Sequence, residues 1–317
     1  MTSVRSRNRA GFSRTDLAVT LLIAAATASL LAPALANSSQ QARLLECQRH
    51  LQTIGLAFQA HHRAHGTFPP CRTRTPIEYG WGVNLLPYLG EEKLHRQFHF
   101  DHHFYAEENQ PVIATPLAVF QCPAAPAANR NVDIVLGLTD YGTHGVAGDY
   151  FANHNVNPMY QVNGKQGKPA LMQNEFQVLS AITDGLSNTT LILEHAGRPE
   201  HYVGRTKQPD NNALAAGPGW WGCWASYQSF HFQGYAQDKQ RRGWDCAVNC
   251  NNSQGLYSFH RGGANALFCD GSVRFLAESL QVELAFALVT RDSQEIIDLA
   301  ELTAASLPDP QASPSNQ

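Results

Sequence analysis

The chain has 317 residues, a formal net charge of −3, and charged side chains at only 15% of its positions. This length is enough for one large domain or two small ones with a real hydrophobic core. The weak negative charge and the absence of a Lys/Arg cluster beyond residue 9 argue against nucleic-acid binding. Abundant Gly, Asn, Gln and aromatic residues favour an exported, loop-rich domain over a helical cytosolic enzyme.

An uncharged stretch over residues 17–36 follows three arginines, Arg5, Arg7 and Arg9. A helix of about twenty residues rises about 30 Å, which matches the apolar core of a bilayer. Positive charges before such a helix hold that end in the cytoplasm. The pattern predicts a single-pass helix in a bacterial inner membrane, with the rest of the chain on the periplasmic or extracellular side.

Three residues stand at the edge of this stretch: Gly11, Phe12 and Asp16. A carboxylate at the membrane edge is costly unless it reaches water or a partner, so Asp16 is a functional candidate. Cleavage after Gly11 would create an α-amine on Phe12, one helical turn from Asp16. An amine and a carboxylate from neighbouring subunits would then neutralise each other in a helical bundle.

The segment resembles the type IV prepilin (class III) signal, which has a basic leader, Gly, Phe and an acid at the fifth mature position. Pro33 falls at the twenty-second mature position, where such pilins also carry proline. The resemblance implies cleavage and methylation by a prepilin peptidase, and assembly with other pilin-like subunits through Asp16. Pilins usually have Glu where this chain has Asp16, and Thr-Leu-Val where it has residues 13–15.

Two other interpretations of the N-terminus stay open. Ala34-Leu35-Ala36 is an acceptable signal-peptidase site, so residues 1–36 would be an ordinary secretory signal cleaved before Asn37. An uncleaved signal anchor is the third interpretation. The sequence does not decide between cleavage at Gly11 and at Ala36.

Residues 38–65 predict a helix whose apolar positions are spaced by three and four residues. Gly66 and the following prolines indicate where this helix ends.

The predicted organisation is a leader (1–11), a membrane and assembly helix (12–36), its continuation packed on a head (37–66), an α+β head (67–303) and a disordered tail (304–317). This is the pilin-like plan, a long N-terminal helix with an antiparallel β-sheet head and long loops.

Turn residues recur along the head with short β-prone runs between them. We expect a strand–turn–strand unit, with strands at 179–182 and 189–193 and the turn at Asp184-Gly185. Residues 260–276 predict a hairpin in which Asp270 and Gly271 form a tight type I′ turn. We also expect a short helix at 81–89 extending towards residue 98, long ordered loops over 200–255, and a helix at 282–288.

The seven cysteines are an odd number, so at least one does not pair within the chain. Cys246 and Cys250 lack a histidine pair at zinc-finger spacing, which favours a disulfide or plain burial over a metal. The remaining connectivity is open.

His260 precedes Asp270-Gly271 by ten residues. This spacing resembles the His-x9-Asp-Gly signature of a large bacterial family of prepilin-like proteins, domain of unknown function 1559. Stretches near residues 47–56, 68–70, 85–89, 120–123, 139–141 and 182–189 agree with the same family. The resemblance covers most of the chain and implies architecture and location, because the family has no settled biochemical activity.

Two interpretations of His260 and Asp270 compete. They share a metal or ligand site with another loop, or His260 caps a loop while Asp270 only forms the turn; the second is favoured. Asp184, Glu194 and Asp270 are weak candidates for a Ca²⁺ site, since calcium takes carboxylate oxygens from loops and major pseudopilins of secretion systems use it. His95 and His99 are a weaker zinc candidate, on the assumption that they share one helix face.

No catalytic motif is present in the sequence, which predicts a protein that is not an enzyme. The expected function is a membrane-anchored pilin-like or pseudopilin-type subunit in a filament or a type II secretion-like assembly. The alternative is an exported or anchored binding module, whose Trp-rich segment 220–224 binds a glycan or another extracellular ligand. A secreted hydrolase has no motif in its favour.

Overall fold

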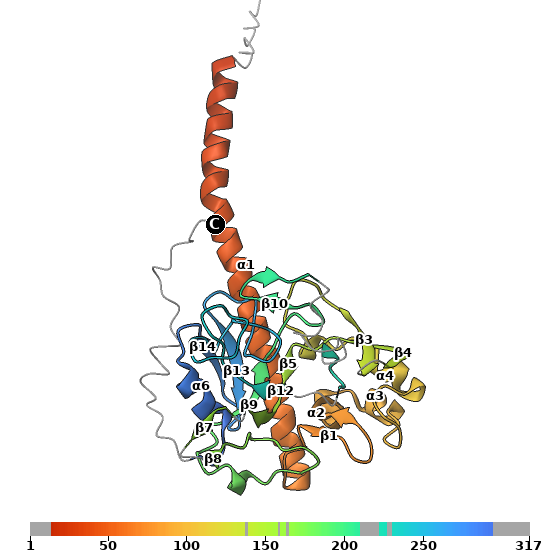
Figure 1. Ribbon diagram of the computed structural model, residues 1–317. Helices are drawn as coiled ribbons and strands as arrows, with labels where there is room; N and C mark the ends of the chain where they lie inside the picture. The colour runs from red at the N-terminus through yellow and green to blue at the C-terminus, as the bar shows by residue number, and fades with distance from the viewer. Residues whose placement is uncertain are drawn as a thin grey trace, which may run out of the picture. The chain divides into compact units, whose positions relative to one another are not determined.

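The computed structural model describes residues 14–136, 139–157, 159–162, 165–209, 222–226 and 230–293. The chain divides into two compact units, Met1–Ala42 and Arg43–Gln317. The predicted leader (1–11), Phe12 and the tail (304–317) lie outside the described residues. Figure 1 shows the elements of the larger unit, which holds all the sites described below.

Helix α1 runs from Arg14 to His65. In the larger unit its apolar stripe is buried, and Cys47, Leu51, Ile54 and Phe58 are each 0% exposed. The opposite face carries polar and exposed residues. The helix ends where Gly66 takes a φ of 74°, a left-handed conformation that glycine adopts at low cost. The predicted helix over 38–65 and its end at Gly66 are confirmed.

Among the residues that the structure describes, no helix combines the length and the hydropathy needed to cross a membrane.

The largest sheet has four antiparallel strands in the order β14-β13-β9-β5. Their bounds are β5 Tyr150–Phe151, β9 Thr190–Glu194, β13 Gly263–Phe268 and β14 Val273–Ala277. Every residue of β9 and β13 is buried, because the sheet is covered on both faces.

Successive side chains of β13 belong to different cores, as the two-residue period of a strand requires. Leu267 joins a core with the stripe of α1. Ala266 and Phe268 join a second core with α6, which spans Val282–Val289 and includes Phe286. The helix predicted at 282–288 is confirmed. The sheet therefore lies between α1 and α6, which places the side chains of one sheet face against α1 (Figure 1).

The remaining elements are short. The other strand pairs are β1 Arg72–Thr73 with β2 Tyr79–Gly80, β3 Asn131–Leu136 with β4 Thr139–Val146, β6 Asn153–Val156 with β12 Phe230–Phe232, β7 Gln161–Val162 with β8 Lys165–Gln166, and β10 Tyr202–Val203 with β11 Thr206–Lys207. The other helices are α2 Trp81–Leu85, η1 Leu86–Leu89, α3 Glu92–Gln97, η2 Glu107–Asn109, α4 Gln110–Ile113, η3 Ala118–Phe120 and η4 Leu179–Ala181. The pairing of β6 with β12 is parallel, an exception to the predicted antiparallel head.

Two local predictions were wrong. Residues 179–181 form the 3₁₀ helix η4 instead of a strand, and β9 pairs with β13 and β5, so both of its edges are occupied. The hairpin at β13–β14 is confirmed, but its turn is not type I′. Within the described loop only Gly271 has a positive φ, at 89°, whereas type I′ needs two such residues. Phe268 donates to the Ser272 carbonyl, which closes a three-residue loop with a glycine bulge.

Two disulfides join Cys47 to Cys122 and Cys246 to Cys250. The second is the disulfide that the sequence favoured for Cys246 and Cys250. Cys71, Cys223 and Cys269 are buried and lie outside these two bonds.

Candidate functional site

A buried polar cluster lies between α1 and the four-stranded sheet. Its members are Cys47 on α1, Cys122 just after η3, Glu194 at the end of β9, and His260 on the loop that leads into β13. All four side chains are 3% exposed or less. One ligand atom from each lies within 4.8 Å of the others. We call this group the His260 cluster.

His260 is at the centre of the cluster. Its Nε2 lies 3.3 Å from Oε1 of Glu194 and 3.4 Å from Sγ of Cys122. The loop around it is fixed by hydrogen bonds, since the His260 amide donates to Oγ of Ser258 and the guanidinium of Arg205 donates to the His260 carbonyl. The ring is therefore held with one nitrogen aimed at both a carboxylate and a disulfide.

The two oxygens of Glu194 have different surroundings. Oε2 accepts hydrogen bonds from the amide and the side-chain nitrogen of Asn265, at 2.8 and 3.0 Å. Oε1 receives no hydrogen bond from any described residue, apart from its 3.3 Å contact with His260. Gln48 on α1 completes the arrangement by donating to Oδ1 of Asn265 at 3.3 Å. A fully buried carboxylate oxygen whose one close polar neighbour is a histidine nitrogen at 3.3 Å is uncommon and calls for an explanation.

A second buried carboxylate, Asp149, supports the backbone beside Cys122. Its Oδ2 accepts from the Cys122 amide at 2.9 Å, its Oδ1 accepts from the Gly197 amide at 3.0 Å, and the guanidinium of Arg130 pairs with it. Burial raises the pKa of Asp149, while Arg130 and the two amides act in the opposite direction. These contacts make Asp149 a support for the cluster.

His260 and Asp270 lie in different surroundings in the folded chain. Asp270 is exposed, and its Oδ1 accepts from the amide and the hydroxyl of Ser272, which stabilises the turn that Gly271 makes possible. His260 instead belongs to the buried cluster. Asp270 therefore has the turn role that the sequence favoured, whereas His260 contacts a carboxylate and a disulfide rather than only capping a loop.

The three calcium candidates do not gather at one place among the described residues. Glu194 lies in the His260 cluster, Asp270 lies in the exposed turn, and Oδ2 of Asp184 accepts from the amide of Ser293 at 2.8 Å. A calcium role for these residues stays a prediction.

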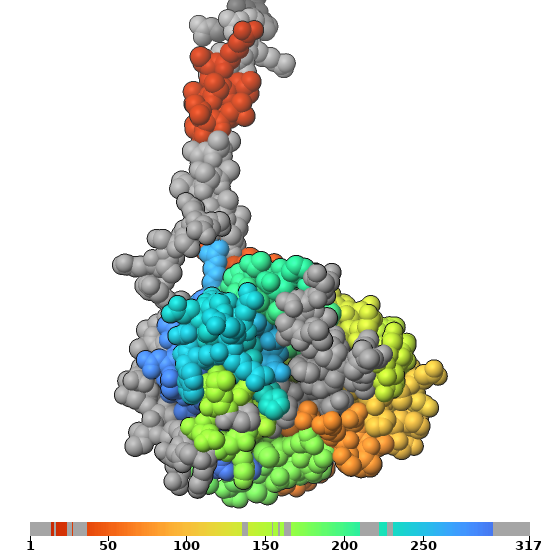
Figure 2. Space-filling model, in the orientation of Figure 1, coloured from red at the N-terminus to blue at the C-terminus, as the bar shows by residue number. Residues whose placement is uncertain are grey.

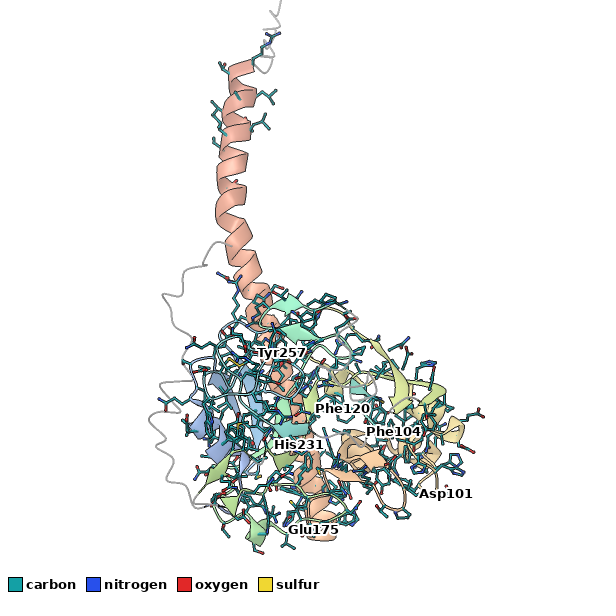
Figure 3. The ribbon with its side chains drawn as sticks, viewed as in Figure 1. Asp101, Phe104, Phe120, Glu175, His231 and Tyr257 are labelled. Atoms are coloured by element: carbon teal, nitrogen blue, oxygen red, sulfur yellow. A yellow bond between two sulfur atoms is a disulfide. The ribbon has the colours of Figure 1, made fainter. Side chains whose placement is uncertain are left out.

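Residues 95–103, which include the zinc candidates His95 and His99, do not form the single helix that the zinc hypothesis assumed. Helix α3 ends at Gln97, so His95 and His99 do not share a helix face. His99, Asp101 and His102 do lie together, and His102 contacts Oδ1 of Asp101 at 3.1 Å. Figure 3 shows Asp101 at the periphery of the larger unit. This group is exposed or half-buried, and exposed acidic groups are common without a metal.

A cavity of about 600 Å³ opens near the C-terminal end of α1. Ring side chains form much of its wall: His61 stacks on Phe176 at 6.2 Å between centroids, and Nε2 of His65 lies 2.8 Å from the hydroxyl of Tyr88. The side-chain nitrogen of Asn84, also in the lining, is buried and has no hydrogen-bond partner in the described part of the chain.

The Trp-rich segment does not form an exposed platform in its described part. Trp224 is 5% exposed, stacks on Phe120 and donates to the Thr115 carbonyl. Positions 220 and 221 lie outside the described residues.

Of the predicted processing and assembly residues, Gly11 and Phe12 also lie outside the described residues. Asp16 and Pro33 lie in α1.

A family model described as a protein of unknown function (DUF1559) matches residues 39–283. The chain belongs to this family. All four residues of the His260 cluster and the whole lining of the cavity fall inside the matched range of this DUF1559 protein. No curated protein and no solved structure matches the chain.

Sequence reasoning identified His260 and Glu194 separately but missed that they meet each other and the Cys47–Cys122 disulfide. The contact joins residues that are far apart in the chain, and no local pattern encodes such a pairing. The only usable signal was that both cysteines occur in stretches that resemble the family.

Proposed function

We propose that this DUF1559 protein is an exported, membrane-anchored structural subunit of the pilin-like type, cut after Gly11 and assembled through α1. The supporting observation is the contrast along α1. Leu17, Leu21 and Leu22 are 57%, 61% and 70% exposed, whereas Leu51 is 0% exposed. Figure 2 shows the described residues at the start of α1, in red, as exposed surface.

Large apolar side chains on one helix gain free energy when lipid or neighbouring helices cover them. A prepilin peptidase and other pilin-like subunits are the partners that this arrangement calls for. Asp16 belongs to the same helix, where it would neutralise the Phe12 amine of a neighbour. The two disulfides fit an exported compartment. The head then supplies the surface of the assembly, as a structural rather than catalytic part.

The test compares Asp16→Ala with Asp16→Glu. We expect both variants to be processed, because cleavage occurs before Phe12. Asp16→Ala should fail to give crosslinked ladders in membranes, since the charged amine loses its partner, whereas Asp16→Glu should give them. Mature mass and crosslinking measure the two steps. Ladders of normal yield from Asp16→Ala would rule out this assembly role.

A second candidate function, a binding module, is favoured by the aromatic cavity beside α1. Its rings and the unpaired nitrogen of Asn84 suit a small ligand with an apolar face and a hydrogen-bond acceptor, such as a sugar. A saturable change in tyrosine and tryptophan fluorescence on addition of maltose would support it. Phe176→Ala should abolish the change, and Val178→Ala, an exposed residue outside the lining, should not. No saturable response in the unsubstituted protein removes maltose as the ligand.

A further inference from the structure

We propose that the His260 cluster has two mutually exclusive states, a Cys47–Cys122 disulfide and a Zn²⁺ site formed by Cys47, Cys122, Glu194 and His260. Two thiolates, one imidazole nitrogen and one carboxylate oxygen are a ligand set that Zn²⁺ accepts in proteins. The inference concerns the head alone and does not depend on the proposed assembly role.

The positions of the four ligand atoms support the metal state. They lie within 4.8 Å of one another. A tetrahedral zinc site with bonds of about 2.0–2.3 Å needs ligand atoms roughly 3.3–3.8 Å apart. His260 and Glu194 are already at 3.3 Å. Once the disulfide is open, rotation of the two cysteine side chains brings the sulfurs to the required separation.

The surroundings of Oε1 of Glu194, whose one close polar contact among the described residues is His260 Nε2 at 3.3 Å, are the second observation. In the disulfide state Oε1 receives no hydrogen bond from the described residues, although Glu194 is 0% exposed. A cation would satisfy this oxygen directly. The other oxygen is fixed by two hydrogen bonds from Asn265, and Gln48 holds Asn265 in turn. Hydrogen bonds to a ligating carboxylate orient it in this way in metal sites.

The conversion between the states balances as a thiol–disulfide exchange. A dithiol reductant is oxidised to its own disulfide, and the Cys47–Cys122 bond takes up two electrons and two protons to give two thiols. Binding of Zn²⁺ then releases those two protons, because thiolates are the ligands. Cys47 and Cys122 are 0% and 3% exposed, so the choice between the states is made while the chain folds or opens locally.

The experiment uses the full chain and Co²⁺ as a spectroscopic probe for Zn²⁺. The chain is unfolded in guanidinium, reduced with dithiothreitol, desalted without oxygen and refolded with Co²⁺. We expect one equivalent of cobalt with a sulfur-to-cobalt charge-transfer band and the intense visible bands of tetrahedral cobalt, all displaced by Zn²⁺. The oxidised chain should show none of these bands.

Variants assign the bands to the cluster. The pair Cys47→Ser and Cys122→Ser should abolish the charge-transfer band, and the pair Cys246→Ser and Cys250→Ser, which removes the other disulfide, should keep it. Glu194→Gln and His260→Gln should each weaken cobalt affinity by about tenfold or more, since each removes a ligand. The exposed Asp270→Asn variant should bind as the unsubstituted chain does.

Two results would overturn the proposal. The first is a refolded chain with free Cys47 and Cys122 thiols that shows no charge-transfer band. The second is a band that survives loss of these two cysteines. If the reduced chain folds poorly, its refolding yield becomes the measurement. The yield must rise with Zn²⁺ in the unsubstituted chain and not in the Cys47→Ser, Cys122→Ser pair, and an equal yield with and without Zn²⁺ contradicts the site.

Discussion

His195 lies inside the larger unit, 1% exposed, with its ring 2.9 Å from Nε of Arg198. Burial holds the pKa of His195 well below its usual value of 6.5, and the charge of Arg198 acts in the same direction. Burial also lowers the pKa values of His50 and His61. The folded chain therefore keeps these rings neutral in a pH range where the unfolded chain protonates them.

For these three rings the difference predicts that the head loses stability as the pH falls below about 6.5, because the unfolded state protonates them more readily than the folded state does. Each such histidine contributes at most about 1.4 kcal/mol per pH unit. The carboxylate of Glu46, whose pKa is lowered to about 2, adds to acid sensitivity only below its unfolded value of 4.5. The urea midpoint measured at several values between pH 7.5 and 5 checks the prediction. His195→Gln should lower the midpoint overall and flatten its slope with pH; an unchanged slope would contradict the role of His195.

The sequence could predict single residues only where their role is local. Gly271 and Gly66 were identified because a turn or a helix end needs a positive φ, and both have one. The role of Asp270 in its turn is local as well. The contact of His260 with Glu194 and Cys122 joins three distant segments, and the Cys47–Cys122 pairing was one of many that seven cysteines allow. Neither follows from spacing along the chain.

Helix α1 is the element whose sequence pattern was most informative. Its apolar residues recur at helical spacing and meet the sheet, so both its existence and its buried face could be predicted. The prediction of a strand at 179–182 was wrong, because a strand forms only where a neighbouring strand has a free edge to pair with. Both edges of β9 are occupied by β5 and β13, and local sequence does not carry that information.

Two leucines of α1 give a matched test of this element. Leu51→Ala removes a side chain that is 0% exposed and should cost about 2–5 kcal/mol of unfolding free energy, since the core does not fully close around the cavity. Leu56→Ala, at a position that is 68% exposed, should stay within about 0.5 kcal/mol of the unsubstituted protein. Urea unfolding measures both, and equal losses would mean that the buried stripe has been misassigned.

At the scale of the whole molecule, the two units are interpreted from different kinds of observation. The matched family range begins at residue 39, so membership in the DUF1559 family describes the larger unit. Residues 1–36 lie outside this range, and their interpretation rests on their sequence alone. The larger unit has a covered sheet, a buried cluster and an aromatic cavity. The basic leader, Gly11-Phe12 and the exposed leucines of α1 are what support an anchored subunit.

The N-terminal residue of the mature protein, from intact mass and terminal sequencing, tests the proposed function most directly. The account predicts Phe12, carrying a methyl group, because a prepilin peptidase cuts after Gly11 and modifies the new amine. That result would make the first part of α1 an assembly helix. Asn37 as the first residue would contradict the account, remove Asp16 and Pro33 from the mature chain, and leave an exported domain whose aromatic cavity becomes the first candidate for its function.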